Sequence, residues 1–156
     1  MTSRDLLTEN EVIQGVINFL GQKGITQSKR VLRKANAEKK ERGVDLKFTL
    51  ENLSKNGNKY IIEAKGNKNK NETAMRSAYD TNFRWALSQI ILRIKVNPAN
   101  YNYNYGIAMP RSDVERCIRL IRDNWALKHL KIRLYGAYYD EDRLTAKEYL
   151  PKDIYL

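Results

Sequence analysis

The sequence KYIIEAKG, residues Lys59–Gly66, combines the pattern of a buried strand with two charged side chains. Its middle, Tyr60–Ile62, is an apolar run of the kind found in strands. Glu63 and Lys65 interrupt the end of that run two residues apart. Because side chains two apart in a strand point to the same face, the strand would place a carboxylate and an ammonium group side by side at the edge of the core. Unpaired charge is costly there, so the pair calls for a partner or a function.

The preceding segment predicts the neighbouring strand. Residues 43–51 (GVDLKFTLE) alternate apolar and polar side chains, which indicates a half-buried strand. Asn56-Gly57, between the two segments, is a favoured two-residue hairpin turn. The two strands should therefore pair antiparallel. Asp45, at the start of the first strand, would then converge with Glu63 and Lys65 at one corner of the sheet.

The remaining chain predicts helices and strands in the order αβββαβαβ. Thr8–Leu20 has helical apolar spacing, with Thr8 as N-cap and Glu11 completing a capping box. The other expected elements are a basic strand near 27–34, a helix over 73–96, a strand over 103–110, a helix capped by Ser112 and a strand over 131–139. The expected buried face of the helix after Ser112 consists of Val114, Ile118, Leu120, Ile121 and Trp125.

This order indicates an α/β fold, with a mixed sheet of four to five strands flanked by helices on both faces. The sequence contains no internal repeat or low-complexity linker, so residues 1–156 are expected to form a single domain. A hydrophobic fraction of 42% and only three prolines argue against global disorder. There is no long apolar run or signal-peptide pattern. A single cysteine and a single histidine exclude an intramolecular disulfide and Cys- or His-rich metal sites. These features predict a cytoplasmic protein without a membrane segment.

The charge balance favours a polyanionic partner. The formal net charge is +11, and residues 23–42 carry eight basic and two acidic side chains. Nucleic acid, and DNA in particular, is the expected partner, although a merely cationic soluble surface is the alternative. The candidate nucleic-acid contacts are Lys29, Arg30, Arg33, Lys34, Arg42, Lys68, Arg84 and Arg93.

Two carboxylates and a lysine at one corner suit a hard divalent cation. Mg²⁺ prefers oxygen ligands and usually keeps positions open for water and substrate phosphate, and Mn²⁺ can replace it. Such an ion would stabilise charge on a phosphodiester in the transition state and lower the pKa of its bound water. Lys65 would orient or deprotonate that water.

With these residues in place, the chain resembles the PD-(D/E)XK nuclease superfamily, which has the restriction-endonuclease-like fold. In that family an Asp opens one strand, and Glu or Asp, any residue and Lys end the next, as Asp45 and Glu63-Ala64-Lys65 do here. A Glu in the helix before these strands and a Gln in the helix after them often belong to the family's site; Glu11 and Gln89 match those positions.

The resemblance implies a Mg²⁺-dependent deoxyribonuclease, an endonuclease of the restriction, repair or recombination type that leaves a 5′-phosphate and a 3′-hydroxyl. Asp45, Glu63 and the Ala64 backbone carbonyl would hold the metal. The sequence departs from the family at two points. Arg93 stands where one subgroup has Tyr four residues after the Gln, and Gly43-Val44 precedes Asp45 in place of the nominal Pro.

Several alternatives stay open at the level of sequence. Glu63 and Lys65 can be a structural ion pair, and a bare Glu-x-Lys also occurs at Glu38-Lys39-Lys40. Glu11 either reaches the metal through water or only caps its own helix, and Gln89 and the arginines can be solvated surface residues. The rival function is a catalytically inactive, basic nucleic-acid-binding module of the same fold. A homodimer would fit double-strand cutting.

Overall fold

The computed structural model describes residues 6–27, 46–49, 59–68, 72–94 and 103–156. Within these ranges the strands are β1 (Thr26–Gln27), β2 (Leu46–Thr49), β3 (Lys59–Ala64), β4 (Tyr103–Pro110), β5 (Arg133–Asp140) and β6 (Arg143–Tyr149). The helices are α1 (Glu9–Gln22), α3 (Glu72–Arg93), α4 (Arg111–Ile121), α5 (Trp125–His129) and α6 (Pro151–Ile154). Among the described residues, none of the helices has the length and apolar character needed to cross a membrane.

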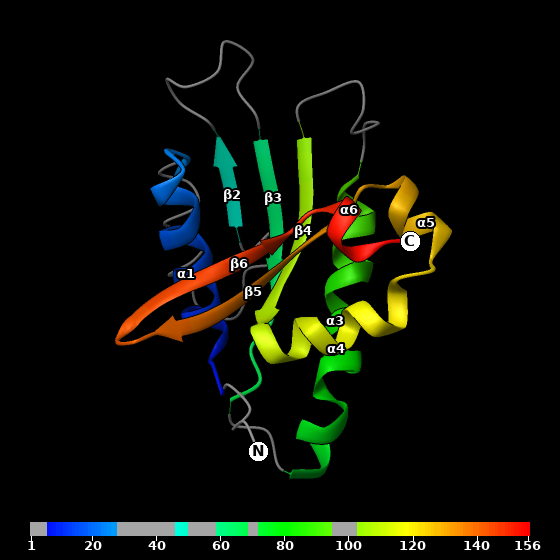
Figure 1. The fold of residues 1–156 in the computed structure, drawn as a ribbon, viewed down its shortest axis with the longest axis horizontal. Helices are drawn as coiled ribbons and strands as arrows, with labels where there is room; N and C mark the ends of the chain where they lie inside the picture. The colour runs from blue at the N-terminus through cyan, green and yellow to red at the C-terminus, as the bar shows by residue number, and fades with distance from the viewer. Residues whose placement is uncertain (1–5, 28–45, 50–58, 69–71, 95–102) are drawn as a thin grey trace.

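The described strands form one mixed sheet in the order β1-β2-β3-β4-β5-β6 (Figure 1). The first three strands pair antiparallel, β3, β4 and β5 run parallel to one another, and β6 returns antiparallel to β5. The α3 helix connects the parallel strands β3 and β4. The predicted α/β class and the antiparallel pairing of the two strands around Asn56-Gly57 are therefore confirmed.

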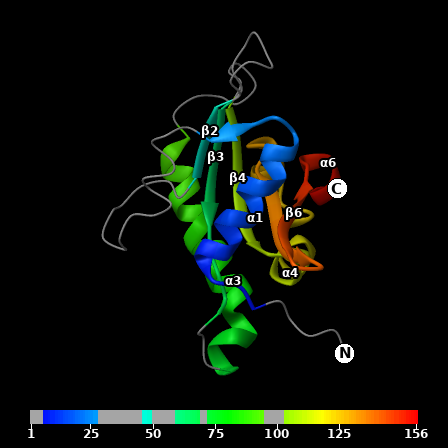
Figure 2. The same cartoon turned by 90° about the vertical axis from the view of Figure 1, so that its left-hand side faces the viewer.

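Helices cover both faces of the sheet. One hydrophobic cluster joins Val12 and Val16 of α1 to Tyr60, Ile62 and Ala64 of β3. The other joins Ile61 of β3 to side chains of α3 and α4. Viewed from the side, β2 and β3 lie between α3 and α1 (Figure 2). Alternate residues of β3 thus point to opposite helical layers, as the period of two requires.

The first helix begins as the sequence predicts. The Thr8 hydroxyl accepts a hydrogen bond from the Glu11 backbone N–H at 3.1 Å, and the Glu11 carboxylate accepts one from the Thr8 backbone N–H at 3.1 Å. Both halves of the predicted capping box are therefore present. The helix ends at Gln22, and Gly24 follows with a φ of 77°, a left-handed conformation that glycine adopts readily.

The helix after β4 differs from the prediction in its N-cap residue and in which of its side chains are buried. Pro110 ends β4 and is also the N-cap of α4, so Ser112 lies inside the helix and the prediction that it is the cap is wrong. Leu120 and Trp125 are exposed, whereas Cys117 takes a place in the core. Trp125 starts the separate helix α5, so a periodicity counted through one continuous helix does not apply to it.

The described sheet has six strands, more than the four to five expected, because β6 was not predicted. Its sequence, RLTAKEY, is largely polar, and its few apolar residues face both sides of the sheet. The two-residue connection Glu141-Asp142 lacks the glycine typical of tight hairpins, although Glu141 has a φ of 54°. The pairing of β6 with β5 therefore has no strong local signal.

Three predicted elements lie partly outside the described residues. Of the expected strand near 27–34, only Gln27 is described, as the end of β1. The expected strand over 43–51 is described at Leu46–Thr49, and the helix over 73–96 is described up to Arg93.

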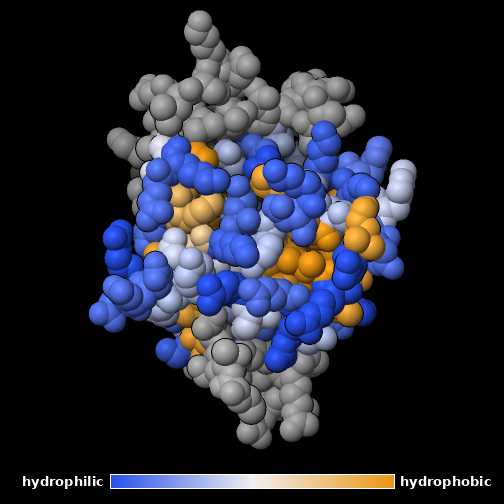
Figure 3. All heavy atoms as spheres, viewed as in Figure 1, coloured by the Kyte–Doolittle hydropathy of each residue, from blue (hydrophilic) through white to orange (hydrophobic). Residues whose placement is uncertain are grey.

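Hydrophilic side chains cover most of the face seen in Figure 1, with smaller apolar patches between them (Figure 3).

Candidate active site

Glu63 is a buried carboxylate near the end of a central strand. It is the fifth of six residues in β3 and is 1% exposed. In the sheet it pairs with Ile107 of the parallel strand β4. Its side chain has the same parity as Ile61, which belongs to the cluster under α3 and α4. The carboxylate therefore lies on the α3 face, where an uncompensated charge would be costly.

Arg93 supplies positive charge next to this carboxylate. Arg93 is the last residue of α3, and its Nε lies 3.8 Å from Glu63 Oε2. The Arg93 side chain is 30% exposed, so the guanidinium reaches from the surface into the buried site. A separation of 3.8 Å is an ion pair but is longer than a hydrogen bond. Arg93, predicted to contact DNA from the surface, is placed beside Glu63.

Lys65 follows directly after the strand. Its backbone N–H donates to the Ala108 carbonyl at 2.9 Å, which continues the pairing of β3 with β4 one residue past Ala64. The residue is half-buried. Among the described residues, Lys65 has no ion pair within 4.0 Å, so its ammonium is not committed to Glu63. Glu63 therefore lies in β3 and Lys65 directly after it, but the ion pair of Glu63 is with Arg93.

The residues after Lys65 form hydrogen bonds with α3, with α4 and with Leu7, which lies just before α1. The Leu7 backbone N–H donates to Asn67 Oδ1 at 2.9 Å, and the Asn67 amide donates to Asp113 Oδ2 of α4 at 3.1 Å. The Asn82 side chain of α3 donates to the Gly66 carbonyl at 2.9 Å. Asn67 and Asp113 are fully buried. This network fixes the end of β3 against the start of α1, against α3 and against α4.

Sequence reasoning missed Asn67 and Asp113. Both look like ordinary loop and helix-surface residues in the sequence, and their burial depends on contacts between distant segments. The one available signal was Gly66, since a glycine directly after a buried strand often marks a close backbone approach. A Cβ built on Gly66 would lie 2.3 Å from the Glu9 backbone nitrogen.

Asp45 lies outside the described residues. The nearest described residue is Leu46, which pairs with Ile62 of β3. Asp45 is joined to Leu46, and consecutive Cα atoms are about 3.8 Å apart. Its proposed convergence with Glu63 stays a prediction.

Glu11 serves as a helix cap. Besides the capping box, its Oε2 accepts a hydrogen bond from the Tyr139 hydroxyl at 2.6 Å. The Tyr139 hydroxyl, and after it the Thr8 backbone N–H, lower the pKa of Glu11 because both bonds favour the ionised form. The α1 helix that carries Glu11 packs on the sheet face opposite Glu63. The interpretation of Glu11 as a capping residue is therefore confirmed, while a role at the metal stays a prediction.

Gln89 shares the side of α3 that carries Arg93. The two residues are four apart, so their side chains are neighbours on the helix surface. Gln89 is half-buried and precedes the fully buried Ile90. Gln89 therefore lies one helical turn before Arg93, the residue that contacts Glu63.

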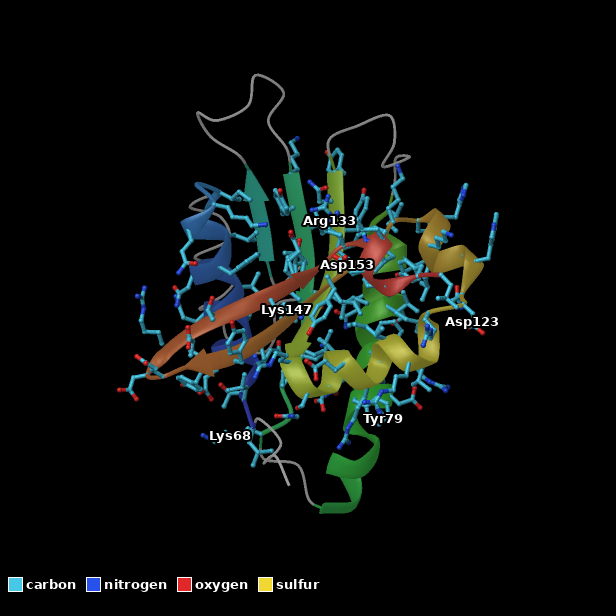
Figure 4. All side chains as sticks on the ribbon, in the orientation of Figure 1. Lys68, Tyr79, Asp123, Arg133, Lys147 and Asp153 are labelled. Carbon is cyan, nitrogen blue, oxygen red and sulfur yellow. The ribbon has the colours of Figure 1, made fainter. Side chains whose placement is uncertain are left out.

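The other candidate DNA contacts have different surroundings. Arg84 is highly exposed and forms an ion pair with Asp80, one turn earlier in α3, at 2.8 Å. Lys68 is exposed beyond the end of β3 (Figure 4) and lies close enough to Glu11 to help lower its pKa. The remaining candidates, Lys29, Arg30, Arg33, Lys34 and Arg42, lie outside the described residues.

One described side chain at this corner, the Glu63 carboxylate, is a donor of the kind that divalent cations prefer. In the described part of the chain, no three His, Cys, Asp or Glu side chains lie together so as to hold a metal ion, and Asp45 is not in that part. However, the Glu63 carboxylate is a hard oxygen donor, and the position beside its Oε2 already accommodates a positive group, Arg93. The guanidinium therefore stands where positive charge is stabilised.

Comparisons of this chain with protein-family models, with curated proteins and with solved structures find no match. The chemistry of the Glu63 site therefore has to be inferred from its own residues.

Proposed function

We propose that this chain is a Mg²⁺-dependent deoxyribonuclease with a restriction-endonuclease-like core, and that Mn²⁺ can replace Mg²⁺. The observation that carries the proposal is the Glu63 carboxylate. It is 1% exposed near the end of a central strand, and a cationic group lies 3.8 Å away. Burial of a carboxylate in such a position requires a compensating positive charge, which a metal ion also supplies.

The sheet topology supports the same proposal. Among the described elements, an α-helix, three antiparallel strands, a further helix and a parallel strand come in the order α1, β1 to β3, α3 and β4. This is the order expected for the core of the resembled superfamily. It puts β3, which contains Glu63 and Ala64 and is directly followed by Lys65, between an antiparallel neighbour and a parallel one.

In this proposal, different residues bind the metal, position the water and contact the phosphate. Asp45, Glu63 and the Ala64 carbonyl would hold Mg²⁺, which when bound supplies charge stabilisation at the phosphodiester and a more acidic water. The Lys65 ammonium would orient the attacking water by a hydrogen bond from Nζ, and the proton of that water would pass to solvent. Gln89, one turn before Arg93, donates a hydrogen bond to a phosphate oxygen. Hydrolysis would leave a 5′-phosphate and a 3′-hydroxyl.

Charge supports DNA as the substrate. A net charge of +11 favours contact with a phosphate backbone, and each neutralised phosphate makes binding weaker at higher salt. Lys68 is exposed beyond the end of β3, the strand that carries Glu63 (Figure 4). In this proposal its ammonium would contact a phosphate of the bound DNA.

A second candidate function is a catalytically inactive, basic nucleic-acid-binding module. The ion pair between Glu63 and Arg93 favours it, because a buried carboxylate that is compensated by an arginine needs no metal for stability. The two candidates make different predictions about metal, since a binding module needs only positive charge.

The test is to incubate the purified protein with plasmid, linear, branched and single-stranded DNA in Mg²⁺ or in chelator. Cleavage that requires Mg²⁺ supports the nuclease. Glu63→Gln and Lys65→Ala should abolish cleavage and leave salt-sensitive DNA binding largely intact. Asp123→Asn, on an exposed carboxylate distant from Lys68 (Figure 4), is the control and should cut at the wild-type rate. DNA binding without cleavage of any substrate would favour the binding module.

A further inference from the structure

The contact between Arg93 and Glu63 lacks the geometry of a fixed structural ion pair. Structural arginine–carboxylate pairs usually form two parallel hydrogen bonds of about 2.8 Å. Here Nε and Oε2 are 3.8 Å apart, and within the described residues Arg93 Nε is buried and has no hydrogen-bond partner. The guanidinium is therefore held near Glu63 by charge and not by a directional bond from Nε.

Arg93 also differs from Arg84, an arginine nearer the middle of α3. Arg84 is 77% exposed, and its Nε lies 2.8 Å from Asp80 Oδ1, at hydrogen-bonding distance. Arg93 is 30% exposed and comes from the last turn of the helix. Its side chain can therefore move between the buried carboxylate and the surface without disturbing a hydrogen bond from Nε to another described residue.

We propose that Arg93 is a counter-charge built into the site, which occupies the cation position at Glu63 until the metal binds and then turns to a DNA phosphate. This inference rests on the proposed nuclease function. A guanidinium and a divalent cation cannot both occupy the position beside Glu63 Oε2, because like charges repel at that distance. Metal binding therefore has to displace Arg93, and removal of its charge strengthens metal binding.

The same exchange couples metal to DNA. Without metal, Arg93 is engaged with Glu63 and contributes little to DNA affinity. With metal bound, the released guanidinium contacts a phosphate and adds one neutralised charge to the complex. By linkage, the metal increases DNA affinity in the wild type more than in a variant without the arginine.

The experiment is a titration of Mn²⁺, followed by electron paramagnetic resonance, into the wild type, Arg93→Gln, Arg84→Gln and Glu63→Gln. Arg93→Gln should bind Mn²⁺ about tenfold more tightly than the wild type, and Arg84→Gln should match the wild type within about twofold. Glu63→Gln should lose the site. Circular dichroism verifies folding, and Arg93→Met, which keeps an unbranched aliphatic stem without the charge, replaces Arg93→Gln if that variant does not fold.

If Arg93→Gln binds Mn²⁺ no more tightly than the wild type, while Glu63→Gln loses the site, this inference is overturned. The proposed function is not affected by that result. Mn²⁺ binding that is absent from the wild type or unaffected by Glu63→Gln overturns the proposed function, and this inference with it. A second readout is affinity for a non-hydrolysable DNA. Arg93→Gln should lower that affinity about tenfold with Mn²⁺ and less than twofold without it, and an equal loss in both conditions contradicts the exchange.

Discussion

Gly66 is the residue at which the site and the fold can be perturbed together. It directly follows Lys65, and its backbone passes against the segment that enters α1. A Cβ at this position would lie 2.3 Å from the Glu9 nitrogen, 2.5 Å from the Thr8 carbonyl carbon and 2.6 Å from the Leu7 carbonyl oxygen. All three are backbone atoms, so no side chain can rotate to make room.

The Gly66→Ala substitution should therefore force the start of α1 away from the end of β3. Ordinary contacts of a Cβ lie at about 3.4–4 Å, so these backbone atoms would have to move by roughly 1 Å. Overpacking of this kind costs about 1–3 kcal/mol, and the rigid backbone places Gly66→Ala at the upper end, about 3 kcal/mol. The hydrogen bonds from Asn67 and Lys68 to the Leu7 carbonyl would be strained as well.

Urea unfolding followed by circular dichroism measures this cost as a lower transition midpoint with an unchanged m-value. Gly21→Ala is the matched control, because nothing lies within 4 Å of a Cβ built there and the residue is in the last turn of α1. Gly21→Ala should leave stability unchanged or raise it by up to about 1 kcal/mol, since alanine favours the helix. A Gly66→Ala protein within about 0.5 kcal/mol of the wild type would refute the close approach.

Three further predictions concern buried or hydrogen-bonded groups. Asn67→Ala should lower the free energy of unfolding by about 2 kcal/mol in urea titrations, because it removes buried hydrogen bonds to Leu7 and Asp113; a loss under about 0.5 kcal/mol would contradict the network. Tyr139→Phe should lower the thermal midpoint at pH 7. The pKa of Glu11 is lower in the folded state than in the unfolded state. The stabilisation by the Tyr139 hydrogen bond is therefore fully present above the unfolded-state pKa of Glu11 and is lost as the pH falls through its folded-state pKa. A difference in thermal midpoint between wild type and Tyr139→Phe that persists at about pH 3 would contradict this prediction. Burial raises the pKa of the Cys117 thiol to about 12, so a thiol reagent should react with it only in denaturant, and rapid labelling of the native protein would show otherwise.

Elements with strong local signals could be predicted from the sequence. The capping box at Thr8 and Glu11 is an interaction between residues three apart, and the spacing of the residues concerned is visible in the sequence. The strands β3 and β4 end within one residue of the predicted boundaries, since both are short apolar runs next to polar or turn residues. The antiparallel pairing of β2 and β3 followed from the turn between them.

Features that depend on distant contacts could not be predicted in this way. Strand β6 has no clear alternation, and its pairing with β5 provides the order that its sequence lacks. Asn67 is buried between Leu7 and Asp113, which are 60 and 46 residues away from it in the sequence. The sequence placed Glu63 and Lys65 on one strand, but the position of Arg93 depends on how α3 crosses the sheet. That packing turned an expected surface arginine into the neighbour of a buried carboxylate.

The proposed chemistry depends on one ion being shared by Asp45 and Glu63. Fe²⁺, bound in place of Mg²⁺ and treated with ascorbate and peroxide, generates radicals that cut the polypeptide next to the residues that hold the ion. Mass spectrometry of the fragments should find cuts near both residues 45 and 63, suppressed by excess Mg²⁺ and absent from Glu63→Gln. Cuts at neither position, or at only one of them, would contradict a shared ion.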